Sequence, residues 1–175
     1  LDALADGQEP SEQPVFIAIP GNPDGVEVSP TDGKIYVNTV GPVGGAPDPA
    51  NGGIYALTGE DIANNKLPPP ADGDLGALDG LDFTAGGVML NTQIRGDVPH
   101  KVTVNCPGAA ATTLALQPGG TWSDLTGPAD LAVRRAADGA QLVVIPELYA
   151  RDATAGDDEV TVLALPADFD AACGG

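Results

Sequence analysis

Residues 22–41 read NPDGVEVSPTDGKIYVNTVG, and this stretch contains the pattern that decides the fold. A polar turn around Pro23 and Asp24 leads into alternating apolar residues at Val26 and Val28. A second turn at 31–33 leads into another stretch rich in β-forming residues. Apolar residues at every second position, bounded by Gly, Pro and Asp, are typical of short strands. The stretch therefore predicts two strands joined by a turn.

The same order of elements occurs twice more, in LDGLDFTAGGVMLNTQI from Leu78 and in PADLAVRRAADGAQLVVIPEL from Pro128. After a polar loop, each of the three units continues into a further strand, at 52–57, 101–106 and 159–165. The units recur about every fifty residues, which indicates propeller blades. A blade is a twisted antiparallel sheet that buries both of its faces only by stacking between neighbours.

We therefore predict an all-β fold of β-propeller blades: three four-stranded antiparallel blades that form half of a six-bladed ring. The expected outer strands are 111–117 in the second blade and a short edge at 64–67 in the first. The stretch 14–20, PVFIAIP, is an outer strand without a blade, and the third unit has no outer strand. The predicted units are a flexible segment 1–13, an outer strand plus first blade 14–67, a second blade 68–118, and a third blade with its tail 119–175.

Three blades cannot close a ring, because propellers have about four to eight. Two arrangements supply the rest. Two copies could join head to tail, each lending residues 14–20 to the third blade of the other, or a separate chain could form the N-terminal half. We favour the second arrangement. The start at Leu1 without a methionine is expected of a processed chain or a fragment.

Composition excludes several classes of function. The chain has 25 acidic and 7 basic residues, giving a net charge of −18, which repels nucleic-acid phosphates. Solvation of the surface explains this charge more simply than a specific partner does. No stretch reaches the roughly 18 apolar residues of a membrane span. With 24 Gly, 17 Pro and 42% apolar residues, the chain is expected to be folded, and to consist of strands and turns.

The two cysteines, Cys106 and Cys173, are too far apart for a redox or zinc CxxC motif. A single disulfide between them is the expectation for an exported chain. We predict a location that is secreted, periplasmic or in the cell envelope.

The three units resemble the last three blades of the six-bladed superfamily that includes gluconolactonases, senescence-marker proteins and paraoxonases, with NHL-repeat proteins as neighbours. The resemblance covers residues 16–165 and is carried by NPDGVEVSPTDGKIYV, GGIYAL, LDGLDFTAGGVML and the long phrase from Gly127 to Leu165. The calcium-dependent phosphatase propellers, which share the PDG…DG.IYV phrase, are a weaker match.

Enzymes of this superfamily hold a divalent ion, usually calcium, at the mouth of the central tunnel through carboxylates and amides. The resemblance places candidate ligands at the starts of the innermost strands and at the ends of the next strands. Oxygen ligands of these types suit a hard cation. The candidate metal ligands are Asn22, Asp24, Asn38, Asp79, Asn91, Asp130 and Glu147.

In the superfamily the ion polarises a lactone or ester carbonyl and a nearby carboxylate handles the proton. The resemblance implies a calcium-dependent lactonase or esterase-like hydrolase, with Asp79 and Asp130 as candidate catalytic bases and a small lactone or ester as substrate. Half of the usual ligand set, including an early Glu, would lie on blades outside this chain.

Other interpretations remain open at this point. Asp before Gly is a favoured turn pair, and Asn at a strand end is often a turn cap, so the candidate ligands can also be turn residues. A non-catalytic propeller that binds a ligand or a partner protein is the alternative function, since fold does not fix function. His100 is the only histidine, and the RGD at 95–97 is too short to carry an interpretation.

Overall fold

The computed structural model describes residues 15–41, 52–73, 75–95, 102–106, 112–113, 125, 128–147 and 159–173. The described residues are almost all strand and loop, with one short helix, α2 (Gly59–Ala63), and a 3-10 helix near the end, η2 (Phe169–Cys173). The predicted all-β class is therefore confirmed.

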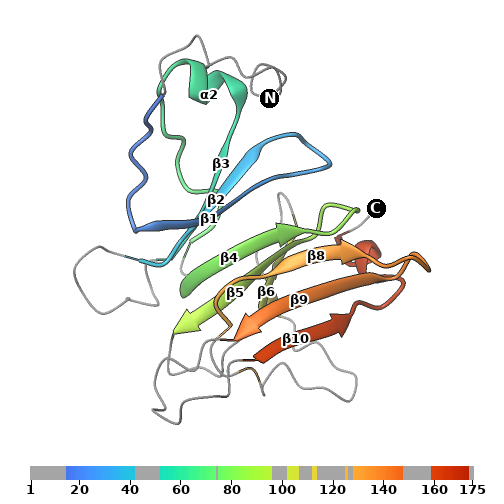
Figure 1. Ribbon diagram of the computed structural model, residues 1–175. Coiled ribbons are helices and arrows are strands. Elements are labelled where there is room, and N and C mark those ends of the chain that lie inside the picture. Colours follow the sequence, from blue (N-terminus) through green and yellow to red (C-terminus); the bar gives the residue numbers. More distant parts are fainter. Residues whose placement is uncertain are drawn as a thin grey trace, which may run out of the picture.

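Three antiparallel sheets follow one another along the chain (Figure 1). Sheet 1 contains β1 (Pro23–Val28), β2 (Ile35–Thr39) and β3 (Ile54–Leu57). Sheet 2 contains β4 (Ala77–Phe83), β5 (Met89–Arg95), β6 (Val102–Asn105) and β7 (Thr112–Thr113). Sheet 3 contains β8 (Ala132–Arg135), β9 (Gln141–Glu147) and β10 (Glu159–Ala164). Strands that follow one another along the chain are neighbours in every sheet.

Sheet 2 lies in the middle and is buried on both faces. Alternation along β5 directs Met89 to the core shared with sheet 1 and Leu90 to the core shared with sheet 3. On the sheet 1 side, the rings of Tyr36 and Phe83 meet edge to face, with centroids 5.3 Å apart. On the sheet 3 side, Val143 and Ile145 are fully buried. Stacking of sheets therefore supplies the core, as expected for blades.

The two outer sheets expose apolar residues on β1 and β10. In sheet 1, Val26 and Val28 of β1 are 62% and 53% exposed. In sheet 3, Val160 and Val162 of β10 are 63% and 56% exposed. Exposed neighbouring valines on strands mark surfaces suited to further packing.

The predicted outer strand of the first blade is wrong. Residues 64–67 form no strand, and the chain forms α2 directly before them. A capping box starts this helix, because Thr58 accepts a hydrogen bond from the backbone N–H of Asp61 while the Asp61 carboxylate accepts one from the N–H of Thr58. The helix ends at Asn64 and Asn65, the latter with φ 47°. Sheet 1 therefore has three strands among the described residues.

The other outer strands have different outcomes. In sheet 2, β7 pairs with β6 within the expected stretch, of which residues 114–117 lie outside the described part. Residues 15–20 pair with no described strand, and Phe16 is 80% exposed. Sheet 3 has three strands among the described residues, as its sequence indicates. The predicted segment 1–13 lies outside the described residues.

Two findings concern the predicted membrane and cysteine properties. None of the helices in the described part has the length and apolar character needed to cross a bilayer. No described cysteine is free, and Cys106 is disulfide-bonded. The side chain of Cys173 lies outside the described part, so its pairing with Cys106 stays a prediction.

Candidate functional site

The first strands of the three sheets approach one another very closely, and two glycines allow it. A Cβ atom on Gly25 of β1 would lie 2.8 Å from both the carbonyl oxygen of Asp79 and the nitrogen of Leu81 in β4. A Cβ atom on Gly80 of β4 would lie 2.6 Å from the Cα of Asp130, which precedes β8. The Asp-Gly pairs therefore lie inside strands, and glycine is needed there for backbone contact, not for a turn.

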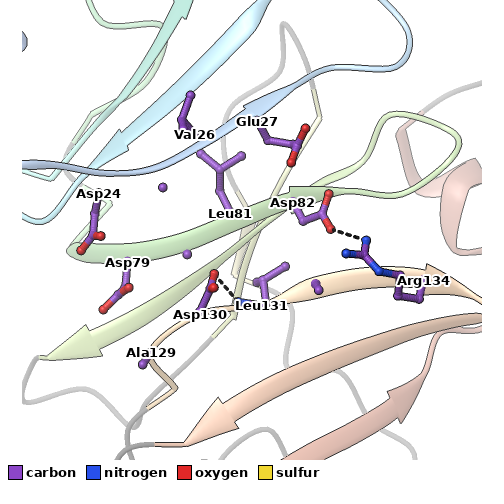
Figure 2. Close-up of a pocket in the computed structure, with 13 residues that line it drawn as sticks. Asp24, Val26, Glu27, Asp79, Leu81, Asp82, Ala129, Asp130, Leu131 and Arg134 are labelled. Atoms are coloured by element: carbon purple, nitrogen blue, oxygen red, sulfur yellow. Dashed lines mark hydrogen bonds and ion pairs between the residues drawn. The ribbon is translucent and has the colours of Figure 1, made fainter. Parts of the chain in front are cut away.

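A pocket of about 680 Å³ lies along these three segments. Figure 2 shows Asp24, Asp79 and Asp130 gathered at one end of the pocket. Each comes from a different sheet unit, as the repeat predicts, because residues at like positions in stacked blades face one axis. The structure thus brings together three of the seven predicted site residues.

Asp79 is the most perturbed of these carboxylates. Burial raises the pKa of Asp79 to about 7, with the negative charges of Asp24 and Asp130 adding to the effect. A hydrogen bond from the backbone N–H of Gly80 acts in the opposite direction. Asp79 therefore carries a proton for part of the time at neutral pH, which suits a general acid or base.

Asp24 and Asp130 are more exposed to solvent. Burial raises the pKa of Asp24, and the charge of Asp130 raises it further. One oxygen of Asp130 accepts a hydrogen bond of 2.8 Å from the backbone N–H of Leu131. These two side chains present carboxylates to solvent within the same pocket as Asp79.

Sequence reasoning missed the charged residues at the other end of the pocket, where Glu27, Asp82 and Arg134 lie (Figure 2). Arg134 lies 3.7 Å from Asp82, and the N–H of Val133 donates to the same Asp82 oxygen at 2.7 Å. Burial raises the pKa of Asp82, against the effect of its hydrogen bonds. The phrases DGVEV and DGLDF contained the signal, because an acid follows the first Asp by three positions in both.

Asn38 and Asn91 are fully buried outside the lining of this pocket. The Asn38 side-chain oxygen accepts from the N–H of Gly25 at 2.8 Å, and its nitrogen donates to the Asn91 side-chain oxygen at 3.1 Å. Asn91 in turn donates to Asn105, and Asn105 donates to Asp72. The oxygens expected to bind a cation are thus occupied by a row of buried amides.

The remaining two candidates also lie outside the pocket lining. Asn22 adopts a left-handed backbone, with φ 57°, and its carbonyl accepts from the N–H of Val40. Glu147 is buried at the end of β9, where Thr161 donates to its carboxylate. Neither residue is placed beside Asp79.

Three of the seven predicted calcium ligands lie in one pocket, and the other four do not line it. The described residues contain no group of three or more His, Cys, Asp or Glu side chains arranged to hold a metal ion. The three pocket carboxylates face the same space, yet the amides and Glu147 that would complete an oxygen shell have other partners. The described residues therefore do not supply a complete oxygen shell for calcium. Calcium stays a prediction from the resemblance.

Comparisons with known proteins give information on the fold alone. No family model and no curated protein match the chain. Among solved structures, an exo-β-1,3-galactanase from Clostridium thermocellum is similar, with a TM-score of 0.51 and 16% sequence identity over 85% of this chain. The chain spans 32% of the length of that galactanase. The fold is thus β-propeller-like and all-β. The resemblance to the gluconolactonase superfamily stays a prediction.

Proposed function

We propose that the pocket is the active site of a hydrolase that uses aspartate carboxylates for acid–base catalysis. One observation carries the proposal: β1, β4 and the segment directly before β8 bring Asp24, Asp79 and Asp130 to the same end of one pocket. Carboxylates that differ in environment are the usual means of dividing acid and base roles in hydrolysis.

The environments suggest a division of roles. Asp79 is the most buried of the three and has a raised pKa of about 7, so it can hold a proton near neutral pH and give it to a leaving oxygen. Asp130 is exposed and takes a proton from the attacking water. The water oxygen forms the new bond, the bond to the leaving oxygen breaks, and the proton on Asp130 later returns to Asp79. Asp24 keeps the local potential negative.

Two substrate classes follow from different observations. The resemblance of the sequence implies a small lactone or ester, which is our first candidate. The second candidate substrate is a glycoside, because the structure is similar to that of a galactanase. Hydrolysis of a glycosidic bond also uses two carboxylates. The acidic pocket disfavours anionic substrates of either class.

We also propose that further sheets complete a ring around the pocket. Exposed valines on both outer sheets support further sheets on either side, in a six-bladed ring with four-stranded blades. A second copy or a second chain would supply those sheets, and residues 15–20 would serve as an outer strand. We also propose export of the protein, as the predicted disulfide suggests.

Hydrolysis assays test the proposed chemistry. The full-length protein is incubated with γ- and δ-lactones, aryl esters and β-1,3-galactan between pH 5 and 9, with and without chelator. Asp79→Asn and Asp130→Asn should lower turnover about 100-fold or more. Asp168→Asn is the matched control, because Asp168 is exposed and lies outside the pocket, and it should leave turnover unchanged. No turnover of any substrate, or full activity in Asp79→Asn, would contradict the proposal.

The second candidate is a non-catalytic propeller that binds a ligand or a partner protein. The exposed valines of β1 favour it, since Val26 lines the pocket and would contact a bound molecule. Under this proposal, neither the wild type nor any variant would show turnover. Calorimetry would instead show that Asp79→Asn changes the affinity for one of the tested substrates.

A further inference from the structure

Asn38 is remote from solvent, yet it contacts the two strands that carry Asp24 and Asp79. Its side-chain oxygen accepts a 2.8 Å hydrogen bond from the N–H of Gly25, the residue after Asp24. Its side-chain nitrogen lies 3.3 Å from the carbonyl oxygen of Gly80, the residue after Asp79, and donates to it. One amide thus joins the two Asp-Gly steps of β1 and β4.

We propose that Asn38 is a positioning residue for the pocket: it fixes β1 against β4 and thereby sets the separation of the Asp24 and Asp79 carboxylates. The inference deepens the proposed function and rests on it for the chemistry of the pocket. Asn38 does not line the pocket, so it acts on the pocket only through Gly25 and Gly80.

The chemistry of the amide explains why this position requires Asn. The Gly25 bond needs an acceptor and the Gly80 bond needs a donor, and a primary amide provides both on one short side chain. Asn38 is 0% exposed, so any hydrogen-bonding group left without its partner would be costly there. The second N–H of the amide donates to Asn91, which holds the Asn38 side chain in this orientation.

Replacement of Asn38 by a neutral residue leaves every charge in the pocket in place. The charged groups that line the pocket together with Asp79 are Asp24, Glu27, Asp82, Asp130 and Arg134. None of them hydrogen-bonds to Asn38 in the structure. An effect of Asn38→Ala on the pocket must therefore come from a shift of the strands.

The chain offers a matched control in Asn105. This residue is 3% exposed and belongs to the same row of buried amides, but its hydrogen bonds go to Asn91 and Asp72, away from Gly25 and Gly80. Loss of a buried amide should lower the melting temperature in Asn38→Ala and Asn105→Ala alike, by about 5 °C. Only Asn38→Ala should affect the pocket.

Two measurements read out the position of the strands. Amide hydrogen exchange by NMR should show Gly25 protected in the wild type and at least about tenfold faster exchange in Asn38→Ala, with no change in Asn105→Ala. In the hydrolysis assay, Asn38→Ala should lower kcat about tenfold while KM stays within about twofold, because misplaced carboxylates affect the reaction more than binding.

Several outcomes would overturn the inference. One is an unprotected Gly25 amide in the wild type, which needs no variant to measure. Another is an equal loss of kcat in Asn38→Ala and Asn105→Ala. If Asn38→Ala does not fold, Asn38→Ser keeps a small polar group at the position and is measured in its place. If the wild type turns over none of the substrates, the proposed hydrolase fails, and the exchange of Gly25 still decides the role of Asn38.

Discussion

Gly80 lies directly against the backbone of Asp130, so that a Cβ atom on Gly80 would be 2.6 Å from the Asp130 Cα and 2.7 Å from the nitrogen of Leu131. Real side chains do not tolerate such distances. A carboxylate oxygen of Asp130 is closer still, but the two other atoms in the way are backbone and cannot rotate aside. Gly80→Ala must therefore push sheet 2 and sheet 3 apart. We expect a loss of about 3 kcal/mol in the free energy of unfolding, measured by urea denaturation.

Gly59 provides the control for this substitution. It starts helix α2, and no atom lies within 4 Å of a Cβ placed there. Gly59→Ala should therefore change the free energy of unfolding by less than about 0.5 kcal/mol. Equal stability of the two alanine variants would contradict the close contact between the first strands.

Asp79→Asn should stabilise the protein at alkaline pH. The folded-state pKa of Asp79, about 7, lies above its ordinary value of 3.8, so the folded chain holds a proton that the unfolded chain releases between these values. The wild type therefore loses stability as pH rises from about 4 to 7, and the asparagine variant does not. Because Asp79 is partly exposed, we expect a gain of only about 1–2 kcal/mol at pH 8.

Thermal melts at pH 5 and pH 8 measure this effect. The advantage of Asp79→Asn over the wild type should grow between the two values, whereas Asp168→Asn should show no such change. An advantage that is the same at both pH values would mean that Asp79 titrates normally in the folded protein.

Calcium binding to this chain should be weak and dependent on pH. The pocket supplies carboxylates without the further oxygens of a full shell, and sparse sites have dissociation constants of about 10⁻⁴ to 10⁻³ M. Since Asp79 must lose its proton to bind a cation, affinity should increase from pH 6 to pH 8. Calorimetric titration measures this, and submicromolar affinity would show that ligands outside the described residues complete the site.

The predicted disulfide between Cys106 and Cys173 should stabilise the fold. It would close a loop of about 67 residues, which corresponds to about 4 kcal/mol in the chain-entropy model. The intact protein should show the mass of the oxidised form and gain 2 Da on reduction. The reduced protein should unfold at lower urea concentration. A free thiol on both cysteines in the native protein would contradict the pairing.

The exposed valines of β10 predict an assembly. If a second copy covers sheet 3, light scattering should give twice the mass of the chain, and the double variant Val160→Glu, Val162→Glu should restore the mass of one chain. Glu60→Lys, on the exposed side of α2, is the control and should leave the mass unchanged. A single-chain mass in the wild type would favour a separate chain as the source of the further sheets that we propose.

Local pattern predicted the sheets well. Alternating apolar residues and glycine-containing turns appear in the sequence three times, and the structure has an antiparallel sheet at each. The clear failure was the short edge at 64–67, where the spacing of Thr58 and Asp61 forms a helix cap. That spacing is visible in the sequence.

The sequence predicted the aspartates of the candidate site, but not which way the asparagines face. The repeat places Asp24 and Asp79 at like positions and Asp130 one position later, and stacking of the sheets brings all three to one pocket. Whether an Asn at a strand end faces that pocket or the space between strands depends on the register of the pairing, which a one-residue shift reverses. The pairing placed Asn38 between the strands.

The sequence by itself determined the strands, their repeat and the acidic residues that each repeat carries, because these depend on neighbours along the chain. Only the tertiary structure decided that glycines let the first strands touch and that one amide joins Gly25 to Gly80, 55 positions further on. Such contacts depend on how whole sheets stack, and no local pattern of residues encodes the distance between two sheets.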